Sequence, residues 1–537
     1  MTYTFHNIAG NDVAGRGRSA ARQGFAIIRG GKCCQCENVA NSNFQLSIGN
    51  IGIGNWQHFH TGNIPTRLPR KLVPATNPRD LSHPFFKGCA TLRVSFFCVA
   101  AVATAVAFTA IADESNLSIS TTNTIQYAMK KKNKPIGESP AEQKDRFAFI
   151  DLFAGAGGLS EGLEEAGFHG IFASEIVPQY ADTYRKNHPG TLVITEDIRK
   201  LDAEEIRKRL GLEKGELALI AGGPPCQGFS INALVRSVLD QRNHLFKEYL
   251  RFVDAFQPRA VLIENVPGLV SFEDGDTLHA ILTALGELGY GADVRILGAA
   301  YYGVPQMRWR TIILGVRGRE LPRFAFPEPI CHAPIRANFT ATFDGRSLIK
   351  TPAPDIPSNF VSVAQAISDL PPLKAGERGK ECKDYATEAQ CDFQRALRRG
   401  SPGVFNHEAP RLSAVNLQRL QYIKPGGNWT DIPHDLLPKG MKAARKSDHT
   451  KRYGRLTPDG LASTVLTKCD PHWGAYFHYS QDRSLTVREA ARIQSFPDHY
   501  IFYGSQQEQF AQVGNAVPPM LAKAVGVALM QVLSEED

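Results

Sequence analysis

Residues 217–230 read Leu-Ala-Leu-Ile-Ala-Gly-Gly-Pro-Pro-Cys-Gln-Gly-Phe-Ser, an apolar run that leads into a turn of glycine and proline. The run Leu217–Ile220 is typical of a buried strand in a parallel sheet. Such strands carry their chemistry in the loops beyond their carboxyl ends, and two successive prolines hold a loop rigid without help from side-chain packing. A cysteine acting as a small core hydrophobe needs no such surroundings. The stretch therefore predicts an α/β fold that presents Cys226 as a nucleophile.

Strands, loops and helices alternate along the preceding part of the chain. Phe147–Asp151 and Gly170–Ser174 are predicted strands, and Ser160–Ala166 is a predicted short helix that ends at Gly167. Units of this kind build a parallel, doubly wound sheet.

A glycine-rich loop follows the first of these strands and opens the helix, so its backbone can approach a ligand closely. Glu175 ends the next strand, 20 residues after Gly155, where a carboxylate can accept both hydroxyls of a ribose. A dinucleotide fingerprint would need Gly or Ala where this loop has Ser160, which argues against an NAD enzyme.

Composition bounds the class of protein only loosely. The chain has 537 residues, 43% of them hydrophobic, which suits two to four globular domains. Of the net charge of +8, six charges belong to residues 1–128, so the basic balance is weak evidence for a nucleic-acid partner. The ten cysteines show no zinc-ligand spacing, so we expect no metal.

Residues 1–128 differ from the rest in composition, and we expect an extension that is disordered or not native, with translation starting at Met129. The apolar run Val94–Ala112 is long enough to span a bilayer, which leaves a membrane anchor as the alternative. Its Ala, Val and Thr content and its distance from Met1 argue against a membrane role.

Six motifs resemble those of the cytosine-C5 DNA methyltransferases of bacterial type, and they occur in that family's order. They are Asp151–Gly158, Gly222–Ser230, Glu264–Gly268, Gln306–Arg310, Arg488–Pro497 and Gly514–Pro519. The resemblance implies a Rossmann-like, S-adenosylmethionine-dependent methyltransferase domain with an inserted, smaller target-recognition domain. The expected parts are a catalytic domain in 146–325, the recognition domain in 326–480 and a return segment in 481–537.

The resemblance also implies roles for individual residues. Cys226 would add to C6 of the base and Glu264 would donate a proton at N3, while Arg308 would serve mainly the base and Arg310 the loop that carries the cysteine. Arg308 and Arg310 are expected on one face of a strand, and spacing leaves their relative weight open. The cofactor-binding residues would be Phe153, Gly155, Gly157, Glu175, Ile176, Asp197, Ile198, Pro224, Asn515 and Val517.

A base stacked in duplex DNA is out of reach of these groups, so the target cytosine is expected to flip out. Ser230, Arg236 and Gln306 are the candidate DNA contacts, although the segment after Cys226 could equally be a charged surface helix. Trp429 and the basic run Lys442–Arg455 are the candidates for reading the DNA sequence.

The implied partner is double-stranded DNA, with or without a cognate restriction endonuclease, and a cytoplasmic, nucleoid-associated monomer is expected. A tRNA cytosine-5 methyltransferase of the same fold is the nearest alternative, but such enzymes typically lack a long insert. A non-catalytic DNA-binding relative is the other alternative, and it would have lost Cys226 or Glu264.

Overall fold

The computed structural model describes residues 147–225 and 245–535. Residues 1–128, with the run Val94–Ala112 and the start at Met129, lie outside the described residues. So do three of the predicted site residues, Cys226, Ser230 and Arg236.

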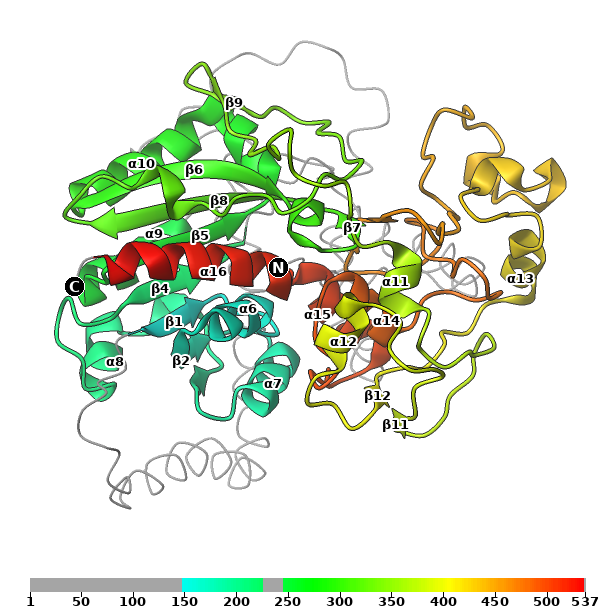
Figure 1. Ribbon diagram of the computed structural model, residues 1–537, viewed down its shortest axis with the longest axis horizontal. Coiled ribbons are helices and arrows are strands. Elements are labelled where there is room, and N and C mark those ends of the chain that lie inside the picture. The colour runs from blue at the N-terminus through cyan, green and yellow to red at the C-terminus, as the bar shows by residue number, and fades with distance from the viewer. Residues whose placement is uncertain (1–146, 226–244, 536–537) are drawn as a thin grey trace, which may run out of the picture. The chain divides into compact units, whose positions relative to one another are not determined.

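A seven-stranded sheet forms the centre of the described chain (Figure 1). Its strands, in spatial order, are β3 (Leu192–Ile194), β2 (His169–Ser174), β1 (Ala148–Leu152), β4 (Leu219–Gly222), β5 (Ala260–Asn265), β8 (Trp309–Arg317) and β6 (Tyr290–Gly298). Strands β1 to β5 pair in parallel, whereas β8 runs antiparallel to both β5 and β6. The predicted all-parallel sheet is therefore wrong at β8. The short connection 299–308 joins β6 to β8, and a parallel neighbour would need a crossover of about a dozen residues or more.

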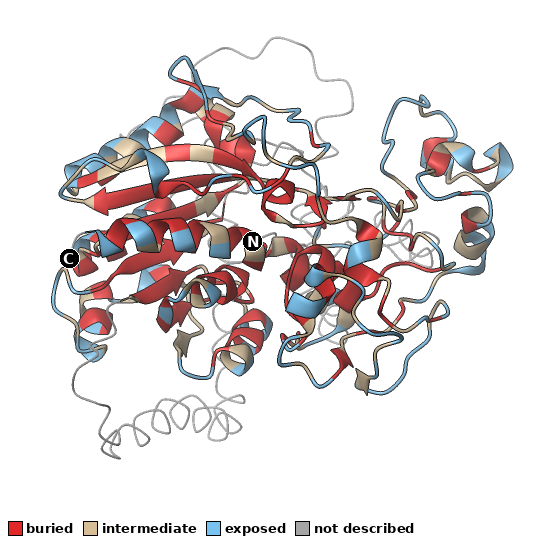
Figure 2. Ribbon diagram, in the orientation of Figure 1, coloured by how far each residue is buried: buried red, intermediate tan, exposed pale blue. Residues whose placement is uncertain are grey.

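Helices cover both faces of the sheet, as a doubly wound fold requires. Alternate residues of β5 show why: Val261 and Ile263 enter one apolar core, and Ala260 and Leu262 enter the other. The first core is shared with α8 (Ala203–Arg209), α9 (Leu245–Phe256) and α10 (Asp276–Glu287). The second is shared with α6 (Gly158–Ala166) and α16 (Pro519–Ser534), and Figure 2 shows the buried strands between these layers.

Helix α6 begins and ends at glycines in the left-handed region. Gly157 is its N-cap, with φ of 92°, and Gly167 is its C-cap, with φ of 107°. The Gly167 N–H donates to the carbonyls of Leu163 and Glu164, which closes the last turn. The predicted helix end at Gly167 is thus confirmed.

Between β8 and α14 (Val487–Ile493) the chain forms short elements rather than a second large sheet. Helices α11 (Val363–Ile367) and α12 (Asp392–Arg398) share one apolar core with α14 and α15 (Gln506–Asn515). A separate small core collects Leu420, Ile423, Trp429, Ile432, Met441, Tyr453 and Phe477 around the end of α13 (Ala414–Leu420). The boundary expected at 480 therefore cuts through a shared core, and the domain division stays a prediction.

The remaining elements are two-residue strands and single turns of 3-10 helix. The strand pairs are β7 (Gln306–Met307) with β13 (Ala462–Ser463), β9 (Thr342–Phe343) with β10 (Arg346–Ser347), and β11 (Cys382–Lys383) with β12 (Val404–Phe405). Helix α7 (Pro178–Asn187) follows β2, and the 3-10 segments are η3 (Ile198–Lys200), η5 (Pro267–Gly275), η6 (Ala299–Tyr302), η7 (Arg323–Ala325), η8 (Trp429–Asp431), η9 (His434–Leu436) and η10 (Lys439–Met441).

Within the described residues, one helical stretch, Gln506–Ser534, has the length and hydropathy of a membrane span. It comprises α15 and α16, and α16 buries Leu521, Val525 and Leu529 against the sheet. This is the behaviour of a core helix.

Buried ion pairs connect the return segment, 481–537, with the inserted part of the chain, 326–480. The guanidinium of Arg492 is fully buried and donates to the carboxylates of Asp369 at 2.6 Å and of Asp498 at 2.6 Å. A second guanidinium, that of Arg398, also donates to Asp369. Paired and hydrogen-bonded in this way, the charges can remain ionised out of water.

Candidate functional site

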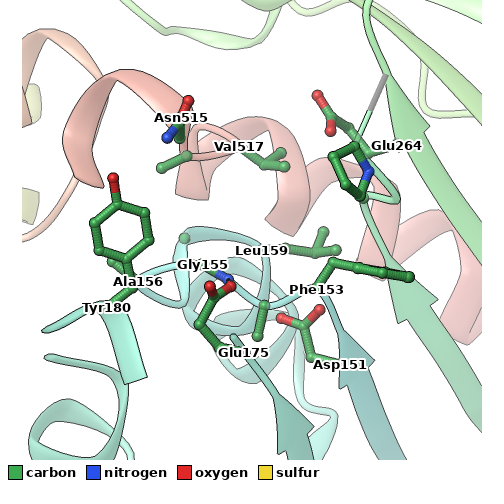
Figure 3. Close-up of a pocket in the computed structure, with 15 residues that line it drawn as sticks. Asp151, Phe153, Gly155, Ala156, Leu159, Glu175, Tyr180, Glu264, Asn515 and Val517 are labelled. Atoms are coloured by element: carbon green, nitrogen blue, oxygen red, sulfur yellow. Dashed lines mark hydrogen bonds between the residues drawn. The ribbon is translucent and has the colours of Figure 1, made fainter. Parts of the chain in front are cut away.

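A pocket opens at the carboxyl ends of four neighbouring parallel strands, where a doubly wound sheet places its ligands (Figure 3). It contains about 570 Å³ of space, including its open mouth. The lining residues come from β1 and the loop after it, from the first turns of α6 and α7, from the loops after β2 and β4, from β5, and from the end of α15 and the segment that follows it. They are Asp151, Phe153, Ala154, Gly155, Ala156, Gly158, Leu159, Glu175, Tyr180, Gly223, Pro225, Glu264, Asn515, Ala516 and Val517.

The first two loops are joined by Glu175. Its carboxylate accepts hydrogen bonds from the Gly155 N–H at 2.8 Å and from the Val177 N–H at 2.8 Å. Gly155 adopts φ of 59°, and a Cβ placed there would meet no atom within 4 Å, so its backbone borders open space. Phe153 also has positive φ, 61°, and lines the same cavity. The structure thus brings these three predicted cofactor-binding residues together.

Asp151 also faces this pocket, and sequence reasoning missed it. One carboxylate oxygen accepts from the Ser160 hydroxyl at 2.6 Å, and that hydroxyl accepts from Tyr184 at 2.7 Å. The other oxygen, Oδ1, is buried and has no hydrogen-bond partner. Burial raises the pKa of Asp151 to about 7 and likewise the pKa of Glu175 to about 7. One sequence signal could have identified Asp151 as a site residue: it is the single acidic residue in the otherwise apolar strand Ala148–Leu152.

Glu264 lies across the pocket from Glu175, at the end of β5 (Figure 3). Its carboxylate is 2.5 Å from Nε of Arg310, and the two side chains are 13% and 12% exposed. The main chain at Gly223 lies close to the Glu264 carboxylate. A Cβ at position 223 would be only 3.1 Å from Oε2 of Glu264, so a larger residue there would crowd the carboxylate. Burial lowers the pKa of Arg310, and the Glu264 carboxylate opposes this effect. The arrangement places a carboxyl group and a guanidinium together at the pocket wall.

Arg308 does not share that position. Its guanidinium is buried and donates to three main-chain carbonyls, those of Val465 at 3.2 Å, Gly514 at 3.0 Å and Ala516 at 2.9 Å. Arg308 lies between β7 and β8, whereas Arg310 lies in β8. The two arginines therefore do not lie on one face of a single strand, although the sequence predicts this. The expected division, with Arg308 serving mainly the base and Arg310 the loop that carries the cysteine, stays a prediction. Two guanidinium nitrogens of Arg308 donate inside the protein, whereas its buried Nε has no partner among the described residues.

Gln306 is buried too, and the prediction of a DNA contact there is wrong. Its amide nitrogen donates to the carbonyl of Ile493 at 2.9 Å and to the side chain of Gln494, and its oxygen accepts from the Val465 N–H at 3.2 Å. Gln494 in turn donates to the Ala516 carbonyl at 2.6 Å. This network holds the segment that carries Asn515 and Val517 against the pocket, where both were predicted to lie.

Five predicted cofactor residues lie near the pocket without lining it. Gly157 caps α6 and packs so closely on Tyr500 that a Cβ would be 2.5 Å from the hydroxyl. Asp197 caps η3 and forms an ion pair with Arg199, and Ile198 is buried in a core. Ile176 is partly exposed, and the carbonyl of Pro224 accepts from the Asn265 side chain at 3.3 Å. No described contact assigns a ligand to these five residues.

Tyr180 and Pro225 also line the pocket, and neither was among the site residues predicted from the sequence. Pro225 is the last described residue before position 226. Burial raises the pKa of Tyr180 to about 12, so its hydroxyl stays protonated at neutral pH. Trp429, a predicted surface residue, is instead 3% exposed, and its indole N–H donates to the carbonyl of Asp448 at 3.0 Å.

Behind the pocket, the ligand atoms of Glu161, Glu164 and His188 lie within 4.8 Å of one another. Each carboxylate already has an imidazole partner: His188 is 2.9 Å from Glu164, and His499 is 3.4 Å from Glu161. These contacts give each carboxylate of the group a side-chain partner among the described residues.

Comparison with known proteins gives a consistent picture. Residues 147–531 match the C-5 cytosine-specific DNA methylase family. The type II methyltransferase M.AgeI of Thalassovita gelatinovora is 34% identical over 432 residues, 72% of this chain and 99% of that protein. M1.HphI of Haemophilus parahaemolyticus is 35% identical over 391 residues, 72% of this chain and 88% of that protein. A solved structure described as a prophage-encoded DNA modification methyltransferase from E. coli shares the fold, with a TM-score of 0.55, 24% identity, and coverage of 72% of this chain and 99% of that one.

Proposed function

Because the chain belongs to the C-5 cytosine-specific DNA methylase family, we propose that it methylates C5 of a cytosine flipped out of a specific duplex DNA site, through a covalent bond between Cys226 and C6. The chain is a DNA cytosine-5 methyltransferase by family. The recognised site and the individual roles below are proposals.

The observation that carries the proposal is the pair of Glu264 and Arg310 at the pocket wall. A cytosine attacked at C6 gathers negative charge at N3 and O2. A carboxyl group can supply a proton at N3, and a guanidinium can donate a hydrogen bond to O2. We assign these tasks to Glu264 and Arg310. Arg308 is a positioning residue that fixes the chain on either side of Asn515.

The family uses S-adenosylmethionine, and the pocket has the features that this cofactor needs. Glu175 offers a carboxylate for ribose hydroxyls, the open backbone at Gly155 admits a close approach, and Phe153 offers an aromatic face for the adenine. The unpartnered Oδ1 of Asp151 suits the ammonium group at the methionine end. The cofactor would supply an electrophilic methyl group on a sulfonium.

The proposed reaction begins with addition of the Cys226 thiolate to C6, with a proton passing from Glu264 to N3, and the displaced electron pair makes C5 nucleophilic enough to take the methyl group. A base then removes the proton from C5, the C6–sulfur bond breaks, and the proton at N3 returns to Glu264. The thiolate, the carboxylic acid and the aromatic ring are thereby restored. Pro225 and Glu264 both line the pocket, and Cys226 is the residue that follows Pro225 in the sequence.

The partners and the setting are inferred from the relatives. M.AgeI and M1.HphI are type II methyltransferases, which supports a cytoplasmic bacterial enzyme acting on DNA, alone or beside a restriction endonuclease. Residues 326–480 are proposed to read the DNA sequence, with Ser230 and Arg236 contacting phosphates, and the protein is proposed to act as a monomer in the nucleoid.

Bisulfite sequencing of host DNA before and after expression of the chain tests the proposal. Protected cytosines should appear in one sequence context in cells that express the chain and disappear with Cys226→Ser. If protection appears in tRNA and not in DNA, the tRNA-methylating alternative replaces the proposed function.

A further inference from the structure

An exposed tryptophan stands out in the inserted part of the chain. Trp473 is 52% exposed, whereas Trp429, in the same interval, is buried. An indole normally buries its large apolar surface, so one held open to solvent is a candidate contact for a partner.

Trp473 is held in place by its neighbours. The guanidinium of Arg452 lies 5.3 Å from the centre of the indole, and the ring of His472 meets it edge to face at 5.4 Å. The main chain beneath is fixed by Tyr453, whose N–H donates to the carbonyl of Pro471 at 2.6 Å. A side chain ordered in advance loses little conformational entropy when a ligand covers it.

Arg452, which lies over the indole, ends a basic segment of the chain. Residues 442–452 include Lys442, Arg445, Lys446, Lys451 and Arg452, and no ion pair joins any of these five to a carboxylate among the described residues. Cations without carboxylate partners attract a polyanion, and phosphate contacts of this kind position a protein on DNA without reading its sequence.

The same segment reaches the catalytic side of the molecule. Val465, eight residues before Trp473, is held by both Gln306 and Arg308. The next residue, Leu466, packs tightly on Gly514. A Cβ added to Gly514 would lie 2.4 Å from the carbonyl oxygen of Leu466. Gly514 precedes Asn515 in the pocket wall. The tryptophan is therefore connected by a short, anchored stretch to the wall of the pocket.

We propose that Trp473, preorganised by Arg452, contacts the bases of the target duplex and contributes to sequence specificity, while the cations of residues 442–452 contact phosphates. This inference rests on the proposed function, since it takes duplex DNA as the substrate. Trp473 thereby takes the base-contacting role that the sequence predicted for Trp429, whose side chain is buried.

The test compares binding of the full chain to two duplexes, one containing the mapped methylation site and one with that site scrambled. Trp473→Ala should weaken binding to the site by about tenfold or more and leave binding to the scrambled duplex unaffected, because only the correct site presents the base contact. Lys446→Ala should weaken both duplexes equally and reduce the slope of log affinity against log salt by about one. Val527→Ala, which removes another exposed apolar side chain (53% exposed) on α16, is the control and should change neither.

An unchanged affinity for the site in Trp473→Ala, or an equal loss on both duplexes, would overturn the inference. If Trp473→Ala loses its thermal unfolding transition, the comparison of Trp473→Phe with Trp473→Leu decides: the aromatic variant should retain site affinity and the aliphatic one should lose it. A wild-type chain that methylates no duplex contradicts the proposed function instead.

Discussion

Nε of Arg310 lies 2.5 Å from the carboxylate of Glu264, and both side chains are nearly nine-tenths buried at the wall of the pocket. The two residues come from neighbouring antiparallel strands, β5 and β8, so the sheet register fixes their meeting. A guanidinium that touches the carboxyl group can hold it in one orientation towards an incoming base. The chemistry proposed for Glu264 therefore depends on Arg310.

We expect Glu264→Gln to lower the single-turnover rate of methyl transfer by about 10²-fold or more, with a much smaller effect on DNA affinity. The amide can still form a hydrogen bond near N3, but it cannot supply a proton. Rapid-quench measurement of methylated product, with DNA binding measured in parallel, checks this. An unchanged rate with weaker binding would mean that Glu264 only positions the base.

Arg310→Lys should also lower the single-turnover rate, because a lysine ammonium cannot span the carboxylate and a second acceptor with a planar fork. The double variant with Glu264→Gln should be no slower than the slower single variant, since the two side chains act as one unit. Multiplicative effects in that double-mutant cycle would show that the residues work independently.

Arg308→Met should act on stability rather than on the chemical step. It removes the side-chain donors of the Val465 and Gly514 carbonyls and one of the two donors of the Ala516 carbonyl, which keeps Gln494, and each buried acceptor left unpaired costs about 1–3 kcal/mol. Urea unfolding should show the loss, and cofactor affinity should fall because Asn515 is no longer fixed. Normal stability with a lost rate would instead support a base-contacting role for Arg308.

Cofactor affinity should rise as the pH increases from 6 to 8. Burial raises the pKa of Asp151 to about 7, so its carboxyl becomes anionic over this interval and can then pair with an ammonium group. Titration calorimetry with S-adenosylmethionine at several pH values measures the trend. Asp151→Asn should remove most of it, and an equal pH dependence in that variant would show that another group is responsible.

The same raised pKa values set the pH dependence of stability without ligand. In the folded chain Asp151 and Glu175 keep protons that the unfolded chain releases above about pH 4, so the free energy of unfolding should fall as the pH rises from about 4 to 7. Thermal unfolding of Asp151→Asn should show a weaker decline than wild type. A decline of equal size in both proteins would argue against the protonated Asp151.

Arg492→Met should destabilise the inserted part by about 3 kcal/mol, because it removes one guanidinium partner from two buried carboxylates: Asp369, which keeps Arg398, and Asp498, which keeps Arg488. Denaturant unfolding measures the loss. Adding Asp369→Asn and Asp498→Asn to this variant should recover part of the stability. If the triple variant is worse than the single one, the carboxylates have other support.

The sequence predicts the strand–loop–helix core because local signals there agree with the tertiary structure. The strand Phe147–Asp151, the helix end at Gly167 and the position of Glu175 follow from apolar runs and glycine placement. The reversal of β8 was missed because an apolar strand reads alike in either direction. The different uses of Arg308 and Arg310 depend on Val465, Gly514 and Ala516, which are more than 150 residues away in the chain. Trp429 was misplaced because it packs in a small core with residues such as Leu420, Met441 and Phe477, and no regular apolar period in this segment indicates that core.

The central claim is methyl transfer to C5 of cytosine with Cys226 as nucleophile. The most direct test incubates duplex DNA with S-adenosylmethionine and the full chain, digests the DNA to nucleosides and identifies the methylated product by mass spectrometry against standards. The account predicts 5-methyldeoxycytidine with the wild-type chain and none with Cys226→Ser, although that variant should still bind the cofactor. Methylation at an exocyclic nitrogen of cytosine or adenine, or 5-methyldeoxycytidine formed at a similar rate by Cys226→Ser, would contradict it.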